Sequence, residues 1–320
     1  MISGTLAVII NMVTIMALGI LVSVGVVSLY YQFNNKNQIK YSAKVYQFIL
    51  WTFVSLPWIV GLVAATVLTF FDSMLIIIQN IVPNVHWHHI DEFDFLSWHG
   101  VLGIFVAVFI LYALTKNLVG LINNVNKIKT LVSLAKSNLQ STYLLETDNP
   151  LAFTGGYFKP KVFVTTGLLN SLSTEEIEII LVHENEHVIN NDSFKKLIFH
   201  FLSSIYPKII SSKLETSMIL TMEQCADHAV AQSHYDRSKI AETLLKVNKI
   251  LIKSKQFNLD KSAVCYYGLD EVEQRIKYLF NNKPNKKYPV YFIFMALIVL
   301  SFFGIYFASS AHHLIELSLS

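Results

Sequence analysis

The sequence predicts a multi-pass α-helical membrane protein with four spans and one α+β domain between spans three and four. Three observations support this fold class. Of the 320 residues, 53% are hydrophobic and only 15% are charged, whereas soluble domains carry about 25% charged residues. Four apolar stretches are long enough to cross a bilayer, which needs about 20 residues. A fifth segment of mixed composition, residues 122–288, is long enough to form one hydrophobic core.

The four apolar stretches run over residues 5–29, 48–71, 96–114 and 289–308. No basic residue precedes the first stretch, so it lacks the charged start of a signal peptide. The predicted division of the chain follows. Residues 1–121 hold three transmembrane spans and an outer loop at 72–97, residues 122–288 form the α+β domain, and residues 289–320 hold the fourth span and a short outer tail.

The distribution of charge predicts the orientation of these spans. The loop at 72–97 contains acidic residues and no lysine or arginine, whereas lysines mark the loop between spans one and two and both ends of the mixed segment. Basic residues favour the cytoplasmic side of a membrane. We therefore expect a protein of the bacterial cytoplasmic (inner) membrane with both termini outside and the mixed segment in the cytosol.

The remaining composition excludes several classes of function. A net charge of +3 gives no reason to expect direct nucleic-acid binding, and the low charge content excludes a disordered chain. Two cysteines, Cys225 and Cys265, cannot form a disulfide framework and are interpreted as buried thiols. The outer loop groups histidines with acidic residues, which are metal-ligand types in a spacing that fits no recognised site. A metal site and an interfacial polar cluster both remain open there; the histidines are His86, His88, His89 and His99.

Within the mixed segment, apolar residues at helical spacing over 118–139 predict an amphipathic helix that leaves the membrane. Three short extended runs, Tyr143–Glu146, Leu151–Thr154 and Lys161–Thr165, predict a small sheet punctuated by glycines and a proline. Helices are expected from Ser173 into the 190s, through much of 194–255, and over 270–280.

One motif carries chemistry. His183-Glu184-Asn185-Glu186-His187 matches the H-E-x-x-H pattern, which has meaning only on a helix, where positions i and i+4 share a face. Ser173 and Glu176 predict a capping box that starts this helix. The two imidazoles could then bind one Zn²⁺, and a carboxylate beside it could act as general base. Helical geometry does not separate Glu184 from Glu186, but the established motif favours Glu184.

A third ligand is expected from a second helix. Glu223 could complete a His₂Glu site that leaves one coordination position for water. Asp227 lies one helical turn later and suits a carboxylate that orients a ligating histidine. His228 and His234 are candidates for stabilising an oxyanion.

Residues 149–227 resemble the membrane zinc peptidases of the gluzincin type. Two families share the matching pieces: the BlaR/MecR-type antirepressor metallopeptidases and the HtpX-type quality-control proteases. Three spans before the motif and one after it are typical of the BlaR/MecR type, and HtpX-type chains have two and two. The matching pieces are Leu151–Gly155, Lys159–Val164, Thr166–Leu169, Leu181–Glu184, His187, Asp192, Glu223 and Asp227.

The resemblance implies a cytosolic zincin-like metallopeptidase domain with zinc ligands His183, His187 and Glu223, catalytic base Glu184 and a structural Asp192. It implies signal transduction by cleavage of a cytosolic regulator, such as a transcriptional repressor, or of the chain itself. About ten residues follow the fourth stretch, so we expect no penicillin-binding domain there. The stimulus is then expected through the 72–97 loop, the lipid or a sensor partner protein. The alternatives are an HtpX-like quality-control protease and a non-catalytic membrane receptor or scaffold.

Overall fold

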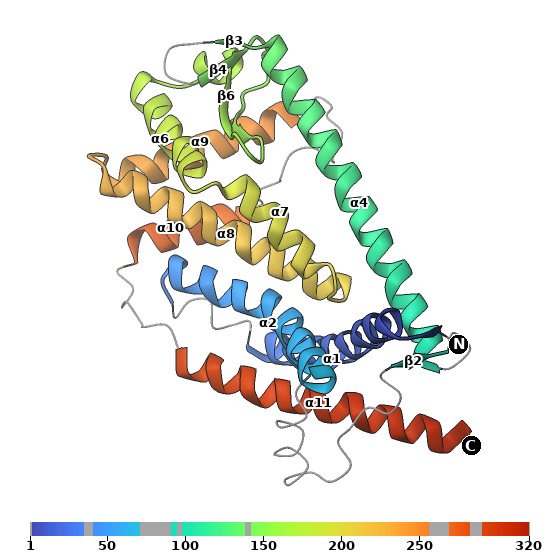
Figure 1. Ribbon diagram of the computed structural model, residues 1–320. Helices are drawn as coiled ribbons and strands as arrows, with labels where there is room; N and C mark the ends of the chain where they lie inside the picture. Colours follow the sequence, from blue (N-terminus) through green and yellow to red (C-terminus); the bar gives the residue numbers. More distant parts are fainter. Residues whose placement is uncertain are drawn as a thin grey trace.

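The computed structural model describes residues 2–34, 41–70, 91–94, 98–137, 142–255, 269–281 and 290–319. Long apolar helices form a bundle, and a small sheet with shorter helices forms a second part beside it (Figure 1). His86, His88, His89 and Cys265 lie outside the described residues, as does most of the 72–97 loop, and the same holds for the side chain of His99.

The bundle consists of α1 (Thr5–Asn34), α2 (Ala43–Phe70) and α11 (Val290–Leu319). Within the described residues, Thr5–Gln32 and Ala43–Phe70 are long and apolar enough to cross a membrane, and α11 contains a shorter apolar stretch, Met295–Phe307. The structure thus supports two of the predicted spans on length and composition.

Glycines bring the three bundle helices into close contact. A methyl group added at Gly61 of α2 would lie 2.6 Å from the carbonyl oxygen of Met16 in α1. A methyl group at Gly19 would lie 3.0 Å from the Cα of Gly61, and one at Gly304 of α11 would lie 3.0 Å from Val60. Small residues allow such close approach, which membrane helices use because apolar side chains gain little by leaving lipid.

Helix α4 (Trp98–Leu134) connects the bundle to the sheet as one continuous helix (Figure 1). The sequence predicted a span over 96–114 and a separate amphipathic stretch over 118–139. The two join because no proline interrupts residues 98–134. At the bundle end, β1 (Ile2–Ser3) pairs antiparallel with β2 (Glu92–Phe93), which places both segments at the same end of the bundle.

The second part contains a four-stranded sheet in the order β3-β4-β6-β5. Strands β4 and β6 run parallel, whereas β3 pairs antiparallel with β4 and β5 pairs antiparallel with β6. The three predicted strands are confirmed within one residue at each end. Strand β5 is an edge strand of this described sheet. The strands are β3 (Lys136–Ser137), β4 (Thr142–Leu145), β5 (Ala152–Gly155) and β6 (Lys161–Thr165).

Within the described residues, six helices lie between the sheet and α11 along the chain. The expected helical region over 194–255 is three helices, because Pro207 stands at the start of α8 and the polar residues 233–236 separate α8 from α9. The six are α5 (Thr166–Leu169), α6 (Thr174–Ile189), α7 (Asp192–Ser203), α8 (Lys208–Gln232), α9 (Arg237–Lys255) and α10 (Leu269–Phe280).

The α7–α8 hairpin packs on the bundle and joins the two parts. Its buried side chains Phe199, Leu214 and Met218 share one hydrophobic core with Leu50 and Val54 of α2. Burial of these apolar side chains stabilises the junction. Hydrogen bonds span the same junction: Trp58 Nε1 donates to the carbonyl of Leu202 (3.2 Å), Tyr206 Oη donates to the carbonyl of Phe53 (2.6 Å), and Tyr31 Oη lies 3.0 Å from Ser217 Oγ.

The glycine contact between α1 and α2 predicts a position-specific effect on stability. Gly61→Ala should lower the free energy of unfolding by about 1–3 kcal/mol, because a backbone carbonyl cannot move aside cheaply. Gly25→Ala is the matched control, since a methyl there meets no described atom within 4 Å. It should be neutral or up to about 1 kcal/mol more stable. Thermal unfolding of the detergent-solubilised variants measures both, and equal behaviour would contradict the packing.

Candidate active site

Helix α6 carries the H-E-x-x-H motif, and the predicted capping box fixes its start. Ser173 Oγ accepts a hydrogen bond from the backbone N–H of Glu176, and Glu176 Oε2 accepts one from the backbone N–H of Ser173. Lys246 Nζ of α9 also donates to Glu176, at 2.7 Å. The helix runs without interruption to Ile189, so His183 and His187 project from one face one turn apart.

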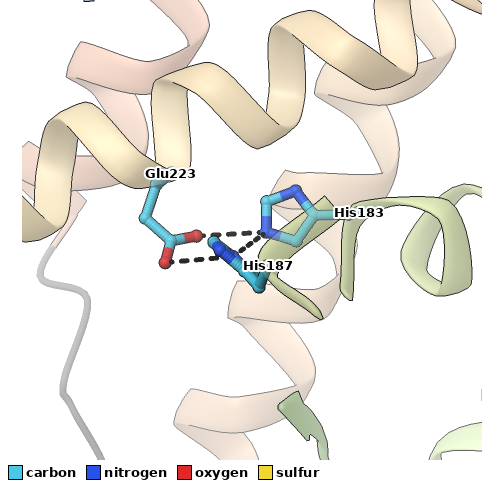
Figure 2. A group of neighbouring side chains, drawn as sticks. All are labelled: His183, His187 and Glu223. Atoms are coloured by element: carbon cyan, nitrogen blue, oxygen red, sulfur yellow. Dashed lines mark hydrogen bonds and ion pairs between the residues drawn. The ribbon is translucent and has the colours of Figure 1, made fainter. Parts of the chain in front are cut away.

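The two imidazoles meet the carboxylate of Glu223 from α8 (Figure 2). His183 Nε2 lies 3.1 Å from Glu223 Oε2 and 3.2 Å from His187 Nε2, while His187 Nε2 lies 3.5 Å from Glu223 Oε1. One ligand atom from each residue lies within 4.8 Å of the others. We call this group the His183–His187–Glu223 cluster.

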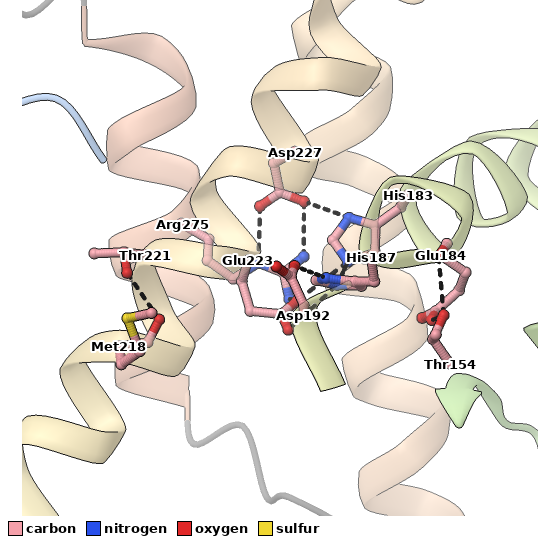
Figure 3. Close-up of polar contacts among 10 residues, drawn as sticks. All are labelled: Thr154, His183, Glu184, His187, Asp192, Met218, Thr221, Glu223, Asp227 and Arg275. Carbon is pink, nitrogen blue, oxygen red and sulfur yellow. Dashed lines mark hydrogen bonds and ion pairs between the residues drawn. The ribbon is translucent and has the colours of Figure 1, made fainter. Parts of the chain in front are cut away.

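Each imidazole also contacts an aspartate through its other ring nitrogen, Nδ1 (Figure 3). His183 Nδ1 lies 3.0 Å from Asp227 Oδ1, and His187 Nδ1 lies 2.7 Å from Asp192 Oδ2. A carboxylate at Nδ1 orients the ring and leaves Nε2 as the ligand atom. Asp192 follows Asn191, whose left-handed backbone (φ 52°) makes the tight turn between α6 and α7. Asparagine adopts this conformation more readily than most residues.

The electrostatics of the cluster favour positive charge. Burial disfavours the charged form of His187, but the carboxylates of Glu223 and Asp192 outweigh it and raise the pKa of His187 to about 10. Burial likewise opposes ionisation of Glu223, but His187 and Arg275 hold the pKa of its carboxyl well below its usual range. Two nitrogens and an oxygen that converge among buried carboxylates are a donor set that suits Zn²⁺.

Glu184 lies beside the cluster and contacts the edge strand. Thr154 Oγ1 of β5 is 2.8 Å from Glu184 Oε2 and 2.9 Å from the carbonyl oxygen of Glu184, so the hydroxyl can donate to either (Figure 3). The charge of Glu184 also contributes to the raised pKa of His187. By contrast, Glu186 accepts a hydrogen bond from the side chain of Asn190 (2.8 Å). The two glutamates thus have different contacts, Glu184 with the edge strand and Glu186 with its own helix end, a difference that helical geometry alone could not show.

The structure does not bring His228 or His234 into the cluster. His228 lies on α8 and its Nε2 contacts the side chain of Gln232 at 3.1 Å, whereas exposed His234 follows the helix and its ring packs against Tyr235. Their role in stabilising an oxyanion stays a prediction, since that role depends on contacts with a substrate. Cys225, which we expected to be a buried thiol, is only partly buried, and desolvation raises the pKa of its thiol to about 11.

Sequence reasoning missed two residues that contact the site. Thr154 was recognised only as part of a strand, and its contact with Glu184 depends on how the sheet packs on α6. Arg275 of α10 contacts both Asp227 and Glu223. The sequence holds a feature that could have drawn attention to Arg275, because it is one of only two arginines among the 25 lysines and arginines. It also shares a helix face with buried Val272 and Leu279.

Comparison with known proteins agrees with this geometry. Residues 86–253, just over half of the chain, match peptidase family M48, and this range includes His183, His187 and Glu223. The chain belongs to peptidase family M48. The predicted relationship to this family of metallopeptidases is thereby confirmed, whereas the number of spans and the bounds of the domain stay predictions.

The curated relatives come from both families that the sequence resembles. The chain is 26% identical over 170 residues to the methicillin resistance mecR1 protein of Staphylococcus aureus and, with the same figures, to that of Staphylococcus epidermidis. The match covers 49% of this chain and only 28% of those proteins. The chain is also 44% identical over 64 residues to protease HtpX homolog 2 of Methanosarcina mazei, covering 19% and 22% of the two chains. No solved structure matches it.

The cap of the motif-bearing helix predicts a pH-dependent contribution to stability. Burial opposes ionisation of Glu176, but Lys246 and Ser173 outweigh it and lower the pKa of this carboxyl. Its contribution is therefore present above the pKa of the unfolded state and lost as the pH falls through the folded pKa. Glu176→Gln should lower the free energy of unfolding by about 1–3 kcal/mol at pH 7, with a smaller difference below about pH 4.

Denaturant unfolding at several pH values measures this effect. Glu175→Gln is the matched control, because the Glu175 side chain is 58% exposed, and it should change stability by less than about 0.5 kcal/mol. A pH-independent difference for Glu176→Gln would show that the charge of the carboxylate is not what stabilises the helix.

Proposed function

We propose that this chain is an integral-membrane zinc endopeptidase whose active site faces the cytosol. The observation that carries the proposal is the convergence of His183, His187 and Glu223, with Glu184 beside them, within a peptidase family M48 domain. Zn²⁺ would be held by the Nε2 atoms of His183 and His187 and by the carboxylate of Glu223. The chemistry of these donors fits the ion, because two imidazoles and one carboxylate leave a coordination position for water.

Each nearby side chain then has a defined task. Bound Zn²⁺ would acidify water and polarise a peptide carbonyl. Asp227 and Asp192 hold the two imidazole rings in orientation through Nδ1. Glu184 acts as general base that takes a proton from the attacking water and passes it to the leaving amine. Because Thr154 contacts Oε2 of Glu184, we expect Oε1 to take that proton.

The edge strand β5 is the proposed binding site for the substrate backbone. It pairs with β6 on one side, and among the described strands no other strand pairs with it. An extended peptide can add to such an edge through main-chain hydrogen bonds. Thr154 would place that peptide next to Glu184, since its hydroxyl links the strand to the carboxylate.

The proposed target is a cytosolic regulatory protein, such as a transcriptional repressor, or the chain itself, cleaved in response to a signal. The relatedness to mecR1 proteins supports this regulatory role. The orientation rests on charge. Lys44 opens α2 at the end that contacts the peptidase domain, while Asp91, Glu92 and Asp94 lie beside the N-terminus at the other end. The basic end is expected in the cytosol, and α4 and α11 would supply the third and fourth spans.

A second candidate is an HtpX-like quality-control protease of the membrane. The 44% identity over 64 residues to protease HtpX homolog 2 favours it. The two candidates differ in substrate range, because a regulatory protease has one or few targets and a quality-control protease has many. A non-catalytic receptor or scaffold is the third alternative.

Glu184→Gln separates these alternatives. The amide cannot accept the proton, so proteolysis should fall by at least about 100-fold, while zinc content stays at the wild-type level because Glu184 is not a proposed ligand. Comparative proteomics of cells with wild-type protein or with Glu184→Gln measures the loss of cleaved products. One lost product supports regulation, and many support quality control. Unchanged products together with an unchanged cell phenotype would contradict a proteolytic function.

Thr154 provides a finer test of how Glu184 is positioned. Thr154→Val removes the hydroxyl at nearly constant size and should lower kcat by about fivefold, because one hydrogen bond contributes about 1 kcal/mol. Thr154→Ser keeps the hydroxyl and should remain close to wild type. We would measure kcat and KM of both variants with the target that the proteomic comparison identifies. A rise in KM with unchanged kcat would instead assign Thr154 to substrate binding alone.

A further inference from the structure

Arg275 is a buried cation that joins α10 to the two carboxylates of α8. Its side chain is 7% exposed. Nε donates to Asp227 Oδ2 at 2.8 Å and Nη2 donates to Asp227 Oδ1 at 2.7 Å, which is the two-pronged geometry that guanidinium groups make with carboxylates. Nη1 lies 3.4 Å from Glu223 Oε2 (Figure 3).

These contacts reach two different parts of the cluster. Asp227 lies 3.0 Å from Nδ1 of His183. Nε and Nη2 of Arg275 therefore bind the same carboxylate that orients the His183 ring. Glu223 is the carboxylate of the cluster itself. A single side chain thus contacts both the group that orients one proposed ligand and the carboxylate that serves as another.

Charge explains why α8 needs this partner. Glu223 and Asp227 stand one turn apart on the same helix, and both are buried, at 4% and 1% exposure. Two like charges at this spacing repel each other, and burying them without a partner is costly. Lysine could supply charge but not the planar fork that holds both oxygens of Asp227.

We propose that Arg275 is a positioning residue of the zinc site, which sets metal affinity by holding Glu223 and the Asp227–His183 pair in place. This inference rests on the proposed function, because it requires the cluster to bind zinc. Arg275 lies beyond residues 86–253, so the family match does not include it. Groups that orient metal ligands in this way typically change metal affinity by about 10–100-fold when removed.

The test is zinc affinity of the full-length, detergent-solubilised protein, measured by competition with a chromophoric chelator. Arg275→Gln should weaken zinc binding by about 10–100-fold. Arg275→Lys keeps the charge but loses the fork, and should weaken binding by a smaller factor. Lys277→Gln is the matched control, because it removes one positive charge from the exposed side of the same helix. It should leave zinc affinity within about twofold of wild type.

A purely structural role is distinguished by two further measurements. The melting temperature of the chelator-treated protein reports stability without metal, and a structural role would lower it while leaving zinc affinity of the folded protein unchanged. In an Asp227→Asn background, Arg275→Gln should have a smaller effect on zinc affinity than in the wild type, because only the contact of Arg275 with Glu223 remains to be lost.

The outcomes separate this inference from the function on which it rests. Zinc affinity of Arg275→Lys or Arg275→Gln equal to wild type, in a protein that binds zinc, overturns the positioning role and leaves the proposed function intact. If Arg275→Gln does not fold, Arg275→Lys decides the question alone. Failure of the wild type to bind zinc overturns the proposed function itself.

Discussion

The site depends on one electrostatic constraint, the burial of three carboxylates around two imidazoles. Asp192, Glu223 and Asp227 are all nearly inaccessible to solvent, and such groups are tolerated only when each has a compensating partner. Arg275 compensates two of them from one side. The imidazoles contact all three carboxylates. A divalent cation bound at Nε2 of both rings would supply the remaining positive charge that the buried carboxylates need. The same contacts that make burial tolerable therefore also orient the proposed ligands.

Helix α8 connects this constraint to the membrane. Its first half, including Leu214 and Met218, packs against α1 and α2 in a common hydrophobic core, and its second half carries Glu223 and Asp227. Helix α10 reinforces the connection, because Tyr278 accepts a hydrogen bond from the first residue of α2 while Arg275 contacts the cluster. The bundle and the proposed active site thus share two rigid elements.

Much of the site could be predicted from the sequence because its signals are local. The capping box, the i, i+4 histidines and the strand runs depend on neighbouring residues, and the structure has each of them. Glu223 could be named from chemistry and from the family pattern. The contacts of Thr154 and Arg275 could not, since they depend on how the sheet and α10 pack on α6 and α8. The orientation of the spans remains a prediction from charge.

X-ray absorption at the zinc edge of the purified, membrane-inserted protein tests the central claim most directly. We predict one zinc per chain surrounded by nitrogen and oxygen at about 2.0–2.2 Å, with the scattering signature of two imidazoles. Substitution of His183 should abolish that signature. A protein that retains no zinc, or a zinc with sulfur neighbours at about 2.3 Å, would contradict the proposed His183–His187–Glu223 site.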